Sequence, residues 1–426
     1  MSNKDVDAMS RENNEKRVLV PQLRFPEFRE AVEWKAEPLK KLAKRSTSKN
    51  AKGEHTRVLT NSAEHGVIDQ RDYFEKDIAN QGNLEGYYIV ENGDYVYNPR
   101  MSTSAPVGPI SKNNVGTGVM SPLYTVFRFA SSDNDFFAHY FKSTHWHHYM
   151  RRASSTGVRH DRISITNDDF MDMPLPVSTP KEQQKIADSL TSVDKLITAE
   201  TQKLDALKTQ KKGLMQQLFP RDGKTVPRLR FPEFRKAGNW TKIAAGQIFS
   251  NRTEKGESRL PIYSVTMNDG LVPRASLDRR IEDVAESGGN KIVRRGDIAY
   301  NMMRMWQGAL GVAPLDCMVS PAYIVLEPQA GVNPLFFYFL LKLPETLRVL
   351  TAHSRGLTED RLRLYYDDFA KVPLLCPSPS EQERIADSLS SLDGLISVHN
   401  SKIDTLKTHK KRLMQLLFPG PDEVYA

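Results

Sequence analysis

The sequence predicts an α+β fold in which two similar globular domains alternate with two long helices. Three observations lead to this prediction: the chain repeats itself, each repeat mixes short β-rich runs with helical stretches, and each repeat ends in a capped heptad pattern. The chain has 426 residues, which at roughly 100 to 200 residues per domain suffices for two or three domains. Antiparallel coiled-coil pairing of the long helices would give this tandem repeat pseudo-two-fold symmetry.

Three matched segments reveal the repeat. Pro21–Arg29 returns as Pro227–Arg235, Gly93–Asn98 returns as Gly296–Asn301, and Glu182–Leu190 returns as Glu381–Leu389. Between these segments the two copies diverge, so the differences cluster in the middle of each repeat. A constant scaffold around a varying centre is typical of a protein whose two domains recognise two different targets. Duplication followed by neutral drift is the alternative, and it predicts scattered differences.

The repeat divides the chain into six segments. They are a flexible tail over 1–20, a first domain over 21–176, a first long helix over 177–220, a second domain over 221–376, a second long helix over 377–419 and a short tail over 420–426. Within the domains, β-rich runs such as Tyr87–Val90 and Tyr323–Leu326 lie among Gly and Asn turns.

Both long helices carry strong start signals. Thr179–Glu182 and Ser378–Glu381 each offer a hydroxyl N-cap, a proline at the first helical position and a glutamate at the third. Apolar residues then recur at heptad spacing as far as Leu218 and Leu417, which predicts a seam that needs a partner helix. A helix over 181–218 would be roughly 57 Å long at 1.5 Å per residue.

The heptad seam is interrupted by Glu200 and His399, at the midpoints of the two helices. Midpoints face each other in an antiparallel pair, so we predict that these residues form a register-setting pair; the alternative is that both tolerate partial exposure. The same symmetry predicts that the chain after Phe418 leads back toward Pro21. The chain ends should then lie near each other, and circular permutation should be tolerated.

Composition excludes several classes of protein. Lys and Arg total 60 against 52 for Asp and Glu, and the net charge of +8 is compatible with a polyanionic partner. Cys317 and Cys376 are the two cysteines, which excludes a disulfide scaffold and zinc sites built on paired cysteines. The N-terminus has no apolar core of signal-peptide length, and no run of about 18 apolar residues occurs. We expect a cytoplasmic protein with no membrane partner.

The order of these features resembles one known family. Openings of the PQLRFPEF type, Gly-Asp-x-x-Tyr-Asn segments, P-x-EQ-x-x-IADSL helix starts and KK-x-LMQ-x-LFP helix ends follow one another twice between Pro21 and Pro419. This duplicated order is similar to that of the DNA-specificity subunit of type I restriction-modification systems. No single motif is diagnostic, whereas their duplicated order is highly specific.

The resemblance implies a non-catalytic subunit. Its domains would be target recognition domains, each reading one half of a split sequence in double-stranded DNA. Its helices would set the gap between the halves and dock two methyltransferase (modification) subunits, which in turn recruit the motor endonuclease (restriction) subunits. S-adenosylmethionine, ATP and magnesium would belong to those partners, with no cofactor bound by this chain. Helices of the predicted length could span major grooves about 34 Å apart, one turn of B-DNA.

Base reading requires Arg, Lys, Asn, Gln, Ser or Thr side chains on exposed loops. Residues 98–104 and 151–160 in the first domain, and 301–307 and 353–358 in the second, meet this requirement. The candidate DNA-binding residues are Arg100, Ser102, Arg151, Arg152, Arg159, His160, Arg304, Gln307, Arg355 and Thr358. Arg162 and Arg361 occupy equivalent positions, which favours a structural or phosphate-binding role for them. For each residue the alternative is a solvated basic loop.

Two other functions are alternatives to this one. The first is a DNA methyltransferase or nuclease with its own active site. Asn98-Pro-Arg100 resembles the start of an amino-methyltransferase motif, but the second proline and the aromatic residue are missing, so we predict no catalytic residues. His145-Trp-His-His148 lacks helical metal-ligand spacing, so we predict no metal site. The second is an autonomous coiled-coil DNA-binding regulator.

Overall fold

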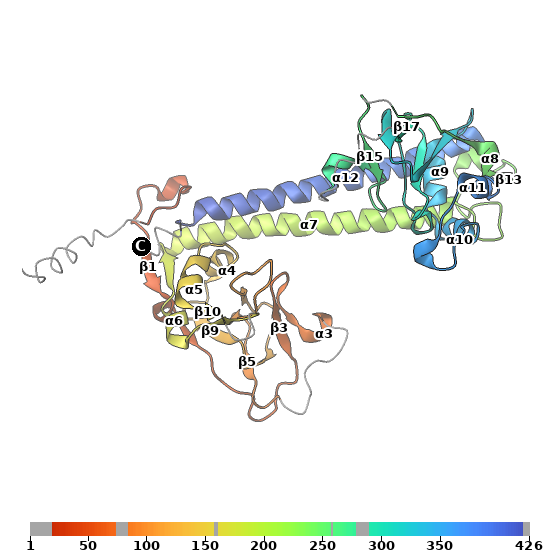
Figure 1. Ribbon diagram of the computed structural model, residues 1–426. Coiled ribbons are helices and arrows are strands. Elements are labelled where there is room, and N and C mark those ends of the chain that lie inside the picture. Colours follow the sequence, from red (N-terminus) through yellow and green to blue (C-terminus); the bar gives the residue numbers. More distant parts are fainter. Residues whose placement is uncertain (1–18, 74–83, 157–160, 257–258, 278–288, 421–426) are drawn as a thin grey trace, which may run out of the picture. The chain divides into compact units, whose positions relative to one another are not determined.

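The computed structural model describes residues 19–73, 84–156, 161–256, 259–277 and 289–420. It separates into two compact units (Figure 1). Unit 1 joins the residues up to Glu200 with those from Lys402 onward, and unit 2 spans Thr201–Ser401. Each unit therefore contains one globular domain together with a part of each long helix, α7 (Pro180–Leu218) and α12 (Pro379–Leu417).

The domain of unit 1 is built on a four-stranded antiparallel sheet of order β2-β9-β6-β7, beside the two-stranded pairs β3-β4 and β5-β8. The interior strand β6 is buried along its whole length, because both of its faces are covered. The elements before α7 are η1 (Pro26–Phe28), β1 (Lys35–Pro38), α2 (Leu39–Leu42), β2 (Ala43–Arg45), β3 (Leu59–Ser62), β4 (Gly66–Asp69), α3 (Gln70–Tyr73), β5 (Tyr88–Val90), β6 (Tyr95–Tyr97), β7 (Ile110–Lys112), β8 (Gly118–Met120), β9 (Thr125–Phe129), α4 (Asp135–Tyr140), α5 (His147–Ala153), β10 (Ser155–Thr156), β11 (Ile163–Ser164), α6 (Asn167–Met171) and β12 (Pro174–Val177).

The domain of unit 2 repeats this plan. Its four-stranded sheet has the order β14-β21-β18-β19, which is the same sequence of connections, so the predicted tandem repeat of an α+β domain is confirmed. The elements between α7 and α12 are η3 (Pro232–Phe234), β13 (Thr241–Ala244), α8 (Ala245–Ile248), β14 (Phe249–Asn251), β15 (Tyr263–Val265), β16 (Leu271–Pro273), η4 (Arg274–Ser276), β17 (Lys291–Val293), β18 (Ile298–Asn301), η6 (Met305–Gln307), β19 (Leu310–Val312), β20 (Cys317–Val319), β21 (Tyr323–Pro328), α9 (Pro334–Leu341), α10 (Pro344–Ala352), η7 (Glu359–Arg361), α11 (Tyr366–Phe369) and β22 (Pro373–Cys376).

A two-stranded pair joins the first and last strands of each domain. In unit 1, β1 pairs antiparallel with β12, with Lys35 opposite Val177. In unit 2, β13 pairs antiparallel with β22, with Thr241 opposite Cys376. Because the last strand leads directly into the long helix, this pairing fixes the point at which the helix leaves the domain.

A buried carboxylate anchors the start of each long helix. Glu182 is fully buried, and it accepts hydrogen bonds from Arg24 at 2.7 Å and 2.9 Å and from the Trp34 indole at 3.1 Å. Glu381 is held in the same way by Arg230 and Trp240. The glutamate of the predicted capping pattern therefore has two roles. It belongs to the helix start, and it binds the arginine and the tryptophan of the segment that opens the domain.

Within each unit the two long helices run antiparallel. In unit 1 the start of α7 packs against the end of α12, with Ile186 and Leu190 in the same hydrophobic core as Leu417. In unit 2 the end of α7 packs against the start of α12, with Leu218 in the same core as Ile385. The predicted antiparallel helix pairing is confirmed inside both units.

The described ends of the chain meet in unit 1. The Leu23 amide donates a hydrogen bond to the Leu416 carbonyl at 2.8 Å, as the Leu229 amide donates to the Gln217 carbonyl at 2.9 Å in unit 2. The segment before the first domain thus takes the place that the inter-repeat connection takes before the second domain, as predicted. No helix among the described residues is long and apolar enough to cross a membrane.

Candidate nucleic-acid interface

In unit 1 the structure brings together two segments that the sequence predicts to contact DNA. The loop after β6 runs antiparallel to the residues just before β11. The Met101 amide donates to the Asp161 carbonyl at 2.9 Å, and Arg100 forms an isolated β-bridge with Arg162. The predicted phosphate-binding arginine therefore lies beside a predicted base-reading arginine.

These segments border a polar hollow of about 300 Å³. Its lining includes the polar or cationic side chains of Thr60, Asn61, Ser62, Asn98, Arg100, Ser102, Ser121, Tyr124 and Arg162. The Thr60 and Tyr124 hydroxyls are 3.1 Å apart, and Asn61, which is 2% exposed, has a buried Oδ1 without a hydrogen-bond partner among the described residues. Guanidinium, amide and hydroxyl groups are those that bind phosphate oxygens and base edges.

The other candidates of unit 1 have local roles or lie outside the hollow. The Ser102 Oγ accepts a hydrogen bond from the Ala105 amide at 3.1 Å, so this hydroxyl also stabilises its own turn. Arg151 and Arg152 are exposed in the last turn of α5, where cations interact favourably with the helix dipole. Arg159 and His160 lie outside the described residues.

In unit 2 the loop after β18 lies beside residues that follow the second predicted segment, 353–358. The Leu364 amide donates to the Met302 carbonyl at 2.9 Å. Arg304 is exposed at the start of η6, whereas Gln307 at its end is partly buried. The Gln307 Oε1 is buried and has no hydrogen-bond partner in the described part of the chain. A buried acceptor of this kind can bind a donor supplied from outside the domain.

The guanidinium of Arg355 is engaged within the domain. Its Nε and Nη2 donate to the two carboxylate oxygens of Asp368 at 2.6 Å and 3.1 Å, and the group lies 5.6 Å from the centre of the Tyr365 ring. The hydrogen bonds from Arg355 lower the pKa of Asp368. Thr358 and Arg361 are exposed on the loop that follows. DNA contact by these three residues stays a prediction.

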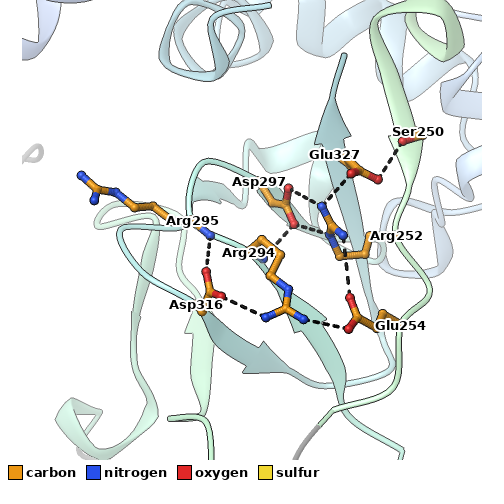
Figure 2. Close-up of polar contacts among 8 residues, drawn as sticks. All are labelled: Ser250, Arg252, Glu254, Arg294, Arg295, Asp297, Asp316 and Glu327. Atoms are coloured by element: carbon orange, nitrogen blue, oxygen red, sulfur yellow. Dashed lines mark hydrogen bonds and ion pairs between the residues drawn. The ribbon is translucent and has the colours of Figure 1, made fainter. Parts of the chain in front are cut away.

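The sequence reasoning did not assign a role to the aspartate of the Gly-Asp-x-x-Tyr-Asn segments. In unit 2 this residue, Asp297, is 2% exposed and accepts hydrogen bonds from Arg252 at 2.6 Å and 3.3 Å (Figure 2). Arg252 also pairs with Glu327 at 2.9 Å and Glu254 at 3.7 Å. The exposed Arg295 side chain points away from this network (Figure 2).

Unit 1 buries the same aspartate with a different arginine. Asp94 is fully buried and accepts hydrogen bonds from Arg128 on β9 at 2.6 Å and 3.0 Å. The strand register places Arg128 at the position that Glu327 holds on β21 in unit 2. The buried acid is kept, while its arginine comes from β9 in unit 1 and from the residue after β14 in unit 2. These aspartates belong to the turn before the central strand and not to the candidate loop that follows it.

Ion pairs across the helix seam were also not predicted from the sequence. In unit 1, Lys410 of α12 donates to both oxygens of Asp194 in α7, at 2.5 Å and 2.7 Å. In unit 2 the roles are exchanged, and Lys211 of α7 donates to Asp393 of α12 at 2.5 Å. Both lysines occupy seam positions of the heptad pattern, and that position was the signal that could have revealed them.

The predicted pair of Glu200 and His399 falls in two different units. Inside unit 1, Glu200 accepts a hydrogen bond from Lys402 at 2.6 Å. His399 is 9% exposed. Contact between the two residues stays a prediction.

The histidine cluster of unit 1 is placed in the domain core and its edge. His145 and Trp146 are buried, and the His145 Nδ1 lies 2.9 Å from the Ser143 Oγ. Burial lowers the pKa of His147 to about 4. Among the described residues, no group of three or more His, Cys, Asp or Glu side chains is arranged to hold a metal ion.

Comparison with known proteins agrees with this duplicated architecture. The family model of the type I restriction modification DNA specificity domain matches residues 43–209 and again residues 233–408. A type I restriction enzyme specificity subunit, MjaVIII of Methanocaldococcus jannaschii, is 24% identical over 289 residues, which are 63% of this chain and 66% of that protein. The HindI specificity subunit of Haemophilus influenzae is 26% identical over 197 residues, 44% of this chain and 42% of that protein.

A solved structure shows the same fold. The crystal structure of the S subunit of a type I restriction-modification system from M. genitalium superposes with a TM-score of 0.58 at 14% sequence identity. The match covers 94% of this chain and 99% of the other.

Fold and loops together define a DNA-specificity protein made from a duplicated domain. The chain belongs to the family of type I restriction modification DNA specificity domains, whose model matches both of its repeats. Specificity subunits are non-catalytic components. The matches cover 66% and 42% of the length of the two curated relatives, so the details of target and partners are taken up as proposals.

Proposed function

We propose that this chain is the specificity subunit of a type I restriction-modification complex, and that its two domains each read one half of a bipartite DNA sequence. The duplicated scaffold carries this proposal. Both domains keep one sheet order and one buried helix anchor, while the loops beside their central strands differ in the residues they offer to a base. A reader of two different half-sites requires this combination of constant frame and variable contacts.

The partner activities follow from the same proposal. Adenine methylation would be carried out by methyltransferase subunits that hold S-adenosylmethionine. DNA cleavage would be carried out by motor endonuclease subunits that use ATP and magnesium. The present chain would supply the DNA contacts, the gap between half-sites and the docking surfaces.

Methylation sequencing of the host genome with and without this gene tests the proposal. We expect the gene to account for one split motif. The variants Arg100→Ala and Arg304→Ala should each relax one half of that motif, by about 1–3 kcal/mol of discrimination for a lost base contact, and leave the other half unchanged. A continuous motif, or a motif present without the gene, would contradict the proposal.

Assays on the purified chain separate the two alternatives. A methyltransferase or nuclease with its own active site would turn over alone, whereas we expect turnover after partner subunits are added. An autonomous regulator would bind its DNA site in gel-shift assays and elute unchanged in gel filtration when the neighbouring operon products are added.

Equivalent apolar residues on the two long helices support two methyltransferase copies. Leu196 is 51% exposed in unit 1, and Leu395 at the same position of the repeat is 46% exposed in unit 2. We expect Leu196→Asp or Leu395→Asp to reduce the number of bound methyltransferases from two to one in native mass spectrometry, because each change places a charge in one docking surface. The control Val32→Asp, at an exposed site outside the helices, should leave two. A single variant that releases both copies would refute separate sites.

A further inference from the structure

The most exposed large apolar side chain among the described residues stands at the tip of a loop in unit 2. Leu357 is 99% exposed, between Arg355 and the short helix η7. The next most exposed, Val32, is at 68%. Single exposed leucines are common on protein surfaces, so the case for a role depends on how the loop holds this one.

The base of this loop is fixed by backbone and side-chain contacts. Arg355 and Arg363 exchange two backbone hydrogen bonds, at 2.8 Å and 2.9 Å, and so form a narrow antiparallel bridge. The bidentate ion pair between Arg355 and Asp368 ties this bridge to α11. The residues between 355 and 363 therefore form a hairpin whose base is anchored to the domain.

The residue before Leu357 has to be glycine. Gly356 has a φ of +142°, and a Cβ at this position would lie 2.5 Å from the Arg361 carbonyl oxygen. The close approach of these two backbone segments folds the tip back on itself and directs Leu357 outward. The Arg361 amide also donates to the Thr358 carbonyl at 2.9 Å, which closes the far side of the tip.

The charges at the tip do not form a phosphate-binding patch. Glu359 and Arg361 are both exposed and opposite in sign, and the Arg355 charge is offset by Asp368. The distinctive feature that remains is an apolar side chain on a narrow tip whose base is an anchored antiparallel bridge. The major groove of B-DNA admits a two-stranded ribbon, and its apolar feature is the C5-methyl group of thymine.

From this geometry we infer that Leu357 is a specificity-determining residue that contacts the methyl group of a thymine in the half-site read by the second domain. The inference rests on the proposed function, which supplies DNA as the ligand. It adds an apolar contact to the polar contacts expected from Arg304 and Gln307. Leu357 would act by packing on the methyl group and would carry no hydrogen bond.

The test uses the assembled complex and duplexes that contain the split motif found by methylation sequencing. The half-site of the second domain is the one relaxed by Arg304→Ala. Each of its thymines is replaced in turn by deoxyuridine, which removes one methyl group, and binding is measured by fluorescence anisotropy. At one position we expect the wild-type complex to bind the thymine duplex about fourfold more tightly, the value of one buried methyl group.

The variant Leu357→Ala should bind the thymine and deoxyuridine duplexes equally, because the side chain that senses the methyl group is gone. Leu315→Ala, another exposed leucine of unit 2 at 41%, should keep the fourfold preference. A half-site without a T·A pair, or a Leu357→Ala complex that keeps the preference, would overturn the inference while leaving the proposed function intact. Absence of specific DNA binding by the wild-type complex would overturn both.

Discussion

The two domains of this chain have the same sheet order but stabilise it with different side chains. Both bury the aspartate of the Gly-Asp turn, yet the first domain pairs Asp94 with Arg128 on β9, and the second pairs Asp297 with Arg252, the residue that follows β14. The cost of burying an unpaired carboxylate explains why the acid always has a partner. This cost does not determine which element of the fold supplies the arginine.

A second difference concerns groups that titrate. His139 in α4 of the first domain stands where the repeat has Phe339 in α9 of the second. Both side chains lie against the helix pair of their own unit. The His139 Nε2 is 3.0 Å from the Thr191 Oγ1, and the Lys211 Nζ lies 5.0 Å from the centre of the Phe339 ring. The comparison teaches that the two domains share their backbone topology and their buried acids, whereas the side chains around these acids and against the long helices differ.

The largest effect is expected from removing the buried glutamate that anchors the long helix in each unit. Glu182→Ala and Glu381→Ala should each destabilise their own unit by about 3–5 kcal/mol, because each leaves a partly buried arginine without its carboxylate partner. Hydrogen exchange followed by mass spectrometry would resolve the units separately. The exposed glutamates Glu33 and Glu383 provide controls, and their alanine variants should change stability by less than about 0.5 kcal/mol. Strong destabilisation in one unit alone would break the equivalence of the two anchors.

The second expected effect is a difference between the two units in how their stability depends on pH. Burial, followed by the nearby lysines, lowers the pKa of His139 to about 4. The charged groups that face it are Lys142, Lys410, Asp194 and Asp135. The unfolded chain binds a proton below the ordinary pKa of 6.5 and the folded unit does not, so this contribution to stability is complete above pH 6.5 and is lost as the pH falls toward 4. At 1.36 kcal/mol per pKa unit, the loss is up to about 3 kcal/mol.

Urea unfolding at pH 7 and pH 4.5, resolved by unit with hydrogen exchange, checks this prediction. Unit 1 should weaken more than unit 2. His147, whose pKa is also lowered to about 4, acts in the same direction, so His139→Phe should remove part of the difference and leave the rest. Equal acid sensitivity of the two units, unaffected by this variant, would refute the assignment.

Much of the frame was predictable from the sequence because the responsible signals are local or repeated. The Thr-Pro-x-Glu start of α7 and its heptads depend on spacing along one helix, and the repeat exposes the domain plan. Pairing partners that depend on the fold were not predictable. Arg128 and Arg252 both bind a buried aspartate, but Arg128 lies on β9 and Arg252 directly after β14, and the neighbours of these strands are set by the sheet order.

The candidate site shows the same division. Arg100 and Arg162 were both selected by residue type and loop position, and the structure places them side by side through a backbone pairing between segments far apart in sequence. Asn61, buried beneath them, was not selected because a buried strand residue carries no loop signal. The ion pair between Arg355 and Asp368 was likewise not predictable, because it depends on how the base of the loop packs against α11.

The smallest expected effect compares the seam ion pairs. Lys410 is bonded to both oxygens of Asp194 and its side chain is 13% exposed, whereas Lys211 makes one bond to Asp393 and is 21% exposed. We expect Lys410→Ala to cost unit 1 about 1 kcal/mol and Lys211→Ala to cost unit 2 somewhat less, because both aspartates remain partly hydrated.

Exchanging the charges sharpens this comparison. Asp194→Lys should cost more than either alanine change, because it places two lysines together in the seam, and adding Lys410→Asp should recover most of the loss. The exchange keeps the attraction and reverses its direction, so recovery measured by urea unfolding isolates the pairing from the helix propensity of each residue. Absence of recovery would mean that the apolar heptad positions alone set the register, and that the ion pairs follow from it.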